Sequence, residues 1–206
     1  MVINIPKKRI ESFWSIWPSF VCLFFMVTNL LLGCVQVIRP LSAVDSRVPS
    51  EAKQRIADAE DAVLIARSRS RDAQLALEQA QERQFKFDQK SPNLGAATGL
   101  ARQVNSAKLN LARLEADYAS VDQKLSESRL QLVYAQTSMR YDIAIYDLQP
   151  LDQSVSDLRT RLLKLRKQKK QAKSDMKSLV DQWWTAYQGL ANSSGTQAFW
   201  VHELVQ

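Results

Sequence analysis

The most distinctive chemistry in this 206-residue chain is a run of positive charge between residues 159 and 177. Nine lysines and arginines lie in this window with one acidic residue, Asp175. Such a density of cations favours binding to an anionic surface, offered by an acidic protein, an anionic lipid or a nucleic acid. Nucleic acid is the weakest candidate because no aromatic residues are interleaved with the charges and no reader motif is present. We expect Arg166, Lys167, Lys169, Lys170 and Lys173 to contact a protein partner.

Aromatic residues follow the cationic window. Trp183, Trp184 and Tyr187 come next, and Trp200 lies in the C-terminal tail. Adjacent helical residues point about 100° apart, so Trp183 and Trp184 cannot share one buried face. Because aromatic side chains are enriched at the centres of interfaces, we expect Trp184 and Trp200 to extend the docking surface. Ordinary capping of the end of a helical bundle is the alternative.

Catalytic chemistry has no visible basis in the sequence. His202 is the only histidine, and the two cysteines, Cys22 and Cys34, lie together in an apolar segment. The five glycines are too sparse for a phosphate-binding loop and argue against a β-rich or dinucleotide-binding fold. We therefore expect a protein that is not an enzyme, with no catalytic residue, no metal site, no cofactor and no small-molecule substrate.

The apolar segment is a candidate membrane span. Positions 12–38 contain no charged residue, and about 20 apolar residues suffice to cross the hydrocarbon core of a bilayer as a helix. The sequence therefore predicts a transmembrane helix over 12–38, with tryptophans at the headgroup level of its first end. The expected membrane anchors are Trp14, Trp17, Phe20, Leu23, Phe24 and Leu31.

The orientation of this span follows from the flanking charges. Lys7, Lys8 and Arg9 cluster before it, whereas the basic residues after it are dispersed. Clustered positive charge stays on the cytoplasmic side. We expect residues 1–11 in the cytoplasm, one pass through the inner membrane, and the remaining helices in the periplasm.

A second interpretation concerns Cys34. The sequence Leu31-Leu32-Gly33-Cys34 resembles a bacterial lipobox, which implies that Cys34 becomes the acylated first residue of an envelope lipoprotein. The apolar stretch is longer than the roughly 7–15 apolar residues of a signal peptide, which favours an uncleaved span.

The rest of the chain reads as long helices. Pro40 and Pro49 bound a linker over 39–49, and a turn containing Pro92, Asn93 and Gly95 interrupts the pattern that follows. Apolar residues spaced alternately by three and four predict heptad helices over 50–90, 97–148 and 152–190, within a coiled-coil region 50–192. Ser50 and Asp152 are expected helix caps, and 193–206 forms an aromatic tail.

Each helix has its own apolar seam. The first seam comprises Ile56, Ala59, Val63, Ala66, Ser70, Ala73, Leu77, Ala80, Gln84 and Phe87. The second comprises Leu100, Val104, Ala107, Leu111, Leu114, Tyr118, Val121, Leu125, Ser128, Leu132, Ala135 and Met139. The third comprises Val155, Leu158, Leu162, Leu165, Lys169, Ala172, Met176, Leu179, Trp183, Ala186 and Leu190.

These patterns predict an all-α protein with one transmembrane helix, followed by a helical hairpin or three-helix coiled-coil bundle. An extended rod that buries its seams against other copies or other proteins is the alternative. The functional hypothesis is a membrane-anchored structural or adaptor subunit of a multiprotein envelope complex, in contact with membrane lipid and with protein partners, further copies of the chain among them. The layout also resembles that of phage inner-membrane spanins, which implies a membrane tether for lysis.

Overall fold

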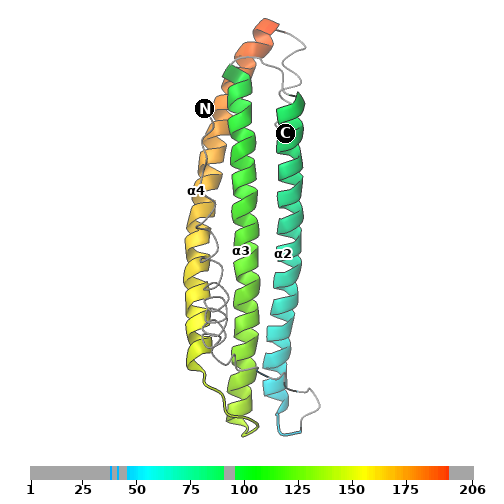
Figure 1. Cartoon of the computed structure of the whole chain (residues 1–206), viewed down its shortest axis with the longest axis vertical. Coiled ribbons are helices and arrows are strands. Elements are labelled where there is room, and N and C mark those ends of the chain that lie inside the picture. Colours follow the sequence, from blue (N-terminus) through cyan, green and yellow to red (C-terminus); the bar gives the residue numbers. More distant parts are fainter. Residues whose placement is uncertain (1–37, 39–40, 42–45, 91–95, 195–206) are drawn as a thin grey trace, which may run out of the picture. The chain divides into compact units, whose positions relative to one another are not determined.

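The computed structural model describes residues 38, 41, 46–90 and 96–194, and three helices account for nearly all of them. They are α2 (Ser50–Lys90), α3 (Ala96–Arg140) and α4 (Gln149–Ser194), shown in Figure 1. At 1.5 Å per residue each helix is about 60–70 Å long. The predicted all-α class is confirmed for the described residues.

The helix α3 lies between the other two. It packs along its length against both α2 and α4, whereas α2 and α4 make at most marginal contact with each other. The side-chain pairs that set the register of α2 on α3 are Glu60–Tyr134, Arg67–Glu127 and Asp88–Arg102. Those that set α3 on α4 are Glu115–Lys169 and Ser128–Ser154. Residue numbers run in opposite directions in every pair, so both neighbours are antiparallel to α3, as in a bundle and not in an extended rod.

The predicted seam of α2 is confirmed residue by residue. Between positions 54 and 89, its ten members are the only residues of α2 that are not exposed. Ala66 and Ala80 are buried, so small residues of this seam lie inside the interface with α3. The seam of α4 is confirmed in the same way over 155–189, with Val180 and Tyr187 as additional partly covered residues.

The helix α3 buries more than its predicted seam. Its buried residues outside that seam are Thr98, Ala101, Asn105, Ala116, Ala119, Tyr134 and Ser138. A helix between two neighbours must present a stripe to each of them, and one apolar seam serves only one neighbour. The second stripe escaped the sequence pattern because alanine, asparagine and serine give little hydrophobic contrast.

The end of α3 differs from the prediction, which extended this helix to residue 148. The helix ends at Arg140. The N–H of Ile143 donates to the carbonyl of Ser138 at 2.8 Å, and that of Asp142 to the carbonyl of Met139 at 3.3 Å. This pair of bonds is a Schellman motif, and Asp142 occupies its left-handed position with φ of 50°. Residues 141–148 therefore form a connection and not helix.

The start of α4 also differs from the prediction. The helix begins at Gln149, so Pro150 lies in its first turn, where a missing N–H costs nothing. The Gln149 N–H donates to the Asp147 carboxylate at 3.0 Å. The prediction that Asp152 caps this helix is wrong, because Asp152 lies inside the first turn and its N–H donates to the carbonyl of Leu148.

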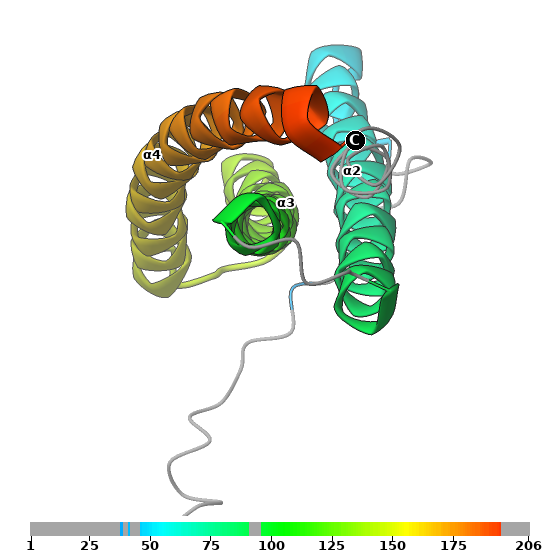
Figure 2. The same ribbon diagram turned by 90° about the horizontal axis from the view of Figure 1, so that it is seen from above.

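One buried cluster joins all three helices. It consists of Phe87 of α2, Ala101 and Val104 of α3, and Trp183 of α4, with Val180 and Tyr187 among the partly buried residues packed against it. Figure 2 shows α4 bending around α3, so that the C-terminal part of α4 comes close to α2. The cluster lies where Phe87 ends the seam of α2, and Phe87 and Trp183 are only 1% and 3% exposed.

The predicted transmembrane helix over 12–38 and its anchors lie outside the described residues, apart from Ile38. Among the helices that the structure describes, none combines the length and the apolar character that crossing a membrane requires. This agrees with the sequence pattern of α2, α3 and α4, which alternates apolar seams with charged flanks.

Candidate functional site

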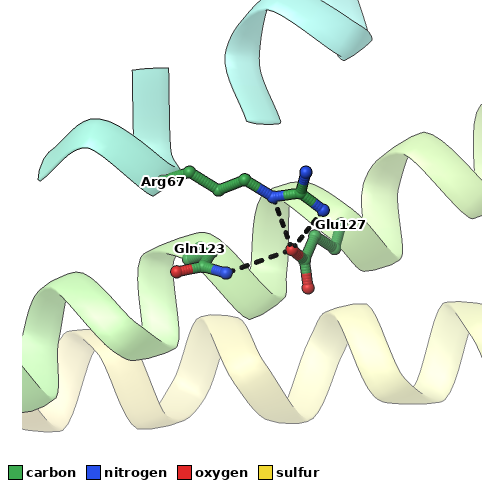
Figure 3. A network of polar contacts seen from close by, with 3 residues as sticks. All are labelled: Arg67, Gln123 and Glu127. Atoms are coloured by element: carbon green, nitrogen blue, oxygen red, sulfur yellow. Dashed lines mark hydrogen bonds and ion pairs between the residues drawn. The ribbon is translucent and has the colours of Figure 1, made fainter. Parts of the chain in front are cut away.

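A network of polar side chains marks one edge of the interface between α2 and α3 (Figure 3). Arg67 of α2 donates from Nε and Nη2 to the same carboxylate oxygen of Glu127 on α3, at 3.1 and 3.0 Å. Gln123 donates to that oxygen at 3.1 Å. Two turns further along α3, the hydroxyl of Tyr134 donates to the Glu60 carboxylate of α2. Burial, and then the hydrogen bond and charge of Glu60, raise the pKa of Tyr134 to about 12.

The same edge continues between α3 and α4. Glu127 and Lys124 line a surface pocket with Ser154 of α4. A second surface pocket is lined by Asn110 and Gln168. Asn110 lies two heptads before Lys124 in α3, and Gln168 lies two heptads after Ser154 in α4. We call this side of the three helices the polar edge. Residues around it carry both signs of charge, as the flanks of a coiled coil usually do.

The predicted cationic surface lies on α4 and is open to solvent. Arg166, Lys167, Lys170 and Lys173 are exposed, as are the other cations of the 159–177 window apart from Lys169. Leu163, which is 53% exposed, lies among them. The surface is therefore accessible to a large anionic partner along about five turns of helix.

The structure gives Lys169 a different setting. Its ammonium group lies 3.6 Å from the Glu115 carboxylate and 5.1 Å from the centre of the Tyr118 ring, both on α3. Lys169 occupies a seam position, so its stem packs toward α3 while its charged end reaches the rim of the interface. It therefore ties α4 to α3, in contrast to its exposed neighbours.

The aromatic residues of α4 divide as the sequence predicted. Trp183 is buried in the three-helix cluster, whereas Trp184 is 43% exposed. Tyr187 links them, with its ring 5.4 Å from Trp183 and 5.6 Å from Trp184 in stacked geometry. The stack joins Trp184 to the buried Trp183 through Tyr187, while Trp184 itself stays partly exposed.

The remaining candidate residues lie outside the described part of the chain. They are Trp14, Trp17, Phe20, Leu23, Phe24, Leu31, Cys34, Trp200 and His202. Within residues 46–90 and 96–194, no group of three histidine, cysteine, aspartate or glutamate side chains could hold a metal ion.

Sequence reasoning missed the contribution of the other two helices to the cationic surface. The pKa of Lys108 on α3 is lowered, first by burial and then by the charge of Arg83 on α2. Two cations are thus neighbours across the interface between α2 and α3. The sequence contains a signal for this row of cations, because Arg55, Arg69 and Arg83 are spaced by two heptads. Which residues of α3 the row faces follows only from the register of the helices.

Comparisons of the chain with protein-family models, with curated proteins and with solved structures found no match.

Proposed function

We propose that this chain is a single-pass membrane protein that acts, without catalytic activity, as a structural or adaptor subunit of an envelope complex. The 12–38 segment anchors it in the inner membrane with residues 1–11 in the cytoplasm. The three helices form the rigid extramembrane part, and α4 docks a protein partner through its cations and Trp184, together with Trp200 of the tail.

One observation carries this proposal: the cations of α4 are displayed on a rigid, solvent-facing helix and are not neutralised along it. Gln171 donates to Asp175, the only acid in the window, at 2.8 Å. A coiled-coil flank that served only solubility would alternate its charges. An excess of one sign on a fixed surface steers and orients an oppositely charged partner.

The membrane part is tested by fractionation. We expect the full chain to stay with membranes after an alkaline carbonate wash, and a reporter fused after Gln206 to be active only in the periplasm. Release into the supernatant would contradict the anchor, and a reporter active in the cytoplasm would contradict the orientation. Mass spectrometry of the Cys34 peptide separates the anchored chain from a lipoprotein, which would carry a diacylglyceryl group.

The docking part is tested by affinity purification from native membranes with a triple variant, Lys167→Glu, Lys170→Glu and Lys173→Glu. This design spares Lys169, which pairs with Glu115. We expect the variant to lose proteins that co-purify with the native chain. The control makes the same charge change elsewhere, with Arg71→Glu, Arg113→Glu and Lys124→Glu, which are also exposed. Equal recovery with both triple variants would contradict docking through α4.

A further inference from the structure

The heptad register places cations from all three helices along the side opposite the polar edge. In α2, Arg67 belongs to the polar edge through Glu127, and Arg69 flanks the seam on its other side. The two heptad positions that flank a seam are two residues apart in sequence, and their side chains point about 150° from each other. Arg69 and Arg83, two heptads apart, therefore lie along the second side of α2, and both are exposed.

The helix α3 contributes to the same side. The antiparallel register set by the pairs Arg67–Glu127 and Asp88–Arg102 brings Arg83 level with Lys108. The charge of Arg83 also helps to lower the pKa of Lys108, after burial. Lys108 and Arg129 are three heptads apart, so they share one row along α3. Glu115 and Asp122 lie in this row between them, and Glu115 pairs with Lys169 of α4. One of the two acids in this row of α3 is thus already engaged.

The helix α4 completes the arrangement. Gln168 faces the polar edge, so Arg166 flanks the α4 seam on the other side, one heptad before Lys173. Continuing the row by one heptad at a time leads to Val180 and then Tyr187, which pack against the cluster containing Ala101 of α3. Ala101 lies one heptad before Lys108, which confirms that these rows of α3 and α4 face each other. We call this side the basic edge, defined by Arg69, Arg83, Lys108, Arg129, Arg166 and Lys173.

Away from the C-terminal parts of α2 and α4, these two helices lie apart on the two sides of α3 (Figure 2). They run parallel, and Phe87 and Trp183 share one cluster, so Arg69 lies at the height of Leu165 and Arg166. Where the facing residues are Phe87, Val180 and Tyr187, the helices meet. Arg69 and Arg166 lie at the heights where α2 and α4 are apart, and both side chains are exposed.

We infer that the basic edge is the binding site for an acidic amphipathic helix of a protein partner, which lies along α3 between the arginine rows of α2 and α4. The inference deepens the proposed adaptor function and rests on it. Within a row the cations are 14 residues apart in α2, 21 in α3 and 7 in α4, all multiples of the heptad rise of about 10.5 Å. Glutamates at one heptad position of a helix repeat at the same interval, whereas each strand of duplex DNA presents a charge about every 3.4 Å. The acids Glu115 and Asp122 interrupt the edge, which disfavours a continuous polyanion.

The test uses the full chain in nanodiscs of neutral phosphatidylcholine and a labelled four-heptad peptide with leucine seams and glutamate flanks. Binding is followed by fluorescence anisotropy. The double variant Arg69→Gln, Arg166→Gln should weaken binding at least tenfold. The matched control Arg71→Gln, Arg161→Gln removes two exposed arginines from outside the basic edge, and it should change binding less than about twofold. Thermal melting of both variants shows that each remains folded.

Position is tested separately. In a chain with Cys22→Ser and Cys34→Ser, a benzophenone label is attached at Ala76→Cys, in the row of Arg69 and Arg83, or at Gln74→Cys, in the row of Arg67. The peptide should crosslink at position 76 and not at position 74. Equal crosslinking at both positions, or equal weakening by both double variants, would overturn the inference.

Other occupants give other results. A scrambled peptide of the same composition that binds as well as the heptad peptide would overturn the helical partner. The helical partner would also be overturned if duplex DNA, or vesicles containing phosphatidylglycerol, bound more tightly than the heptad peptide and this binding depended on Arg69 and Arg166. A native chain that forms a dimer which the double variant loses would assign the edge to a second copy. Because the peptide assay needs neither native membranes nor a native partner, it fails independently of the proposed function.

Discussion

The hydrogen bond from Tyr134 to Glu60 gives the sharpest prediction about the stability of the helices. Tyr134 is 8% exposed, whereas Glu60 is exposed. In the variant Tyr134→Phe the Glu60 carboxylate is free to turn to water, so no buried charge is left behind. We expect the free energy of unfolding at pH 8 to fall by about 1 kcal/mol, typical of one hydrogen bond to a group that solvent can reach.

The pH dependence tests the cause of this loss. The pKa of Tyr134 is raised in the folded chain to about 12, from about 10 for an unfolded tyrosine. A raised pKa means that the stabilisation is complete below pH 10 and is lost as the pH rises through 12. Two pKa units correspond to about 2.7 kcal/mol as an upper value. The native chain should therefore lose its advantage over Tyr134→Phe between pH 10 and 12, and at the upper end become the less stable of the two.

The assay is urea unfolding of both chains, followed by circular dichroism, at a series of pH values from 8 to 12. Titrations shared by both chains cancel in the difference between them. The difference in phenolate absorbance between the native chain and Tyr134→Phe reports the pKa of Tyr134, because the other four tyrosines are common to both chains. Glu60→Gln should lower that pKa, while burial keeps it above its usual value. A difference in unfolding free energy that stays constant across this pH range would refute the reasoning.

Three further predictions concern packing and helix ends. No donor among the described residues lies within hydrogen-bond distance of Gln84 Oε1, which is buried at a seam position, so Gln84→Leu should raise the unfolding free energy by about 1 kcal/mol in urea titrations; a fall would show that the oxygen is satisfied. Asp142 holds a left-handed conformation, so Asp142→Gly should stabilise the chain by up to about 1 kcal/mol, measured as a rise in melting temperature, and an unchanged or lower value would exclude strain there. Leu125 is 2% exposed, so Leu125→Asp should cost more than about 4 kcal/mol and abolish cooperative melting of the helical dichroism signal, whereas a native-like melt would show that this seam is not core.

The sequence was sufficient to predict the seams of α2 and α4, because each of these helices has one neighbour and buries one stripe. It was insufficient for α3, where the residues of the second stripe, such as Ala116 and Ala119, carry no apolar contrast. The connection to α4 was misplaced for a local reason. A proline suits the first turn of a helix as well as the position after one, so Pro150 alone does not tell which helix it bounds. Asp142 is an unusual residue for a left-handed helix terminus.

The candidate site was predictable to a similar degree. The exposure of Arg166 and its neighbours follows from the heptad positions alone. The pairing of Lys169 does not, because Glu115 is far away in sequence and only the antiparallel register brings it near. The alignment of Arg69 with Arg166 has the same origin, since α2 and α4 are related only through α3 and the cluster that contains Phe87 and Trp183.

The position of α3 between its two neighbours also determines how the molecule carries a mechanical load. Tension applied between the start of α2 and the end of α4 has no direct route from one to the other, apart from the contacts around Phe87 and Trp183. The tension must pass from α2 to α3 and then from α3 to α4. Because it acts along the helix axes, it shears each interface, and the side chains of an interface resist this sliding at the same time. We expect the three helices to yield together under such tension.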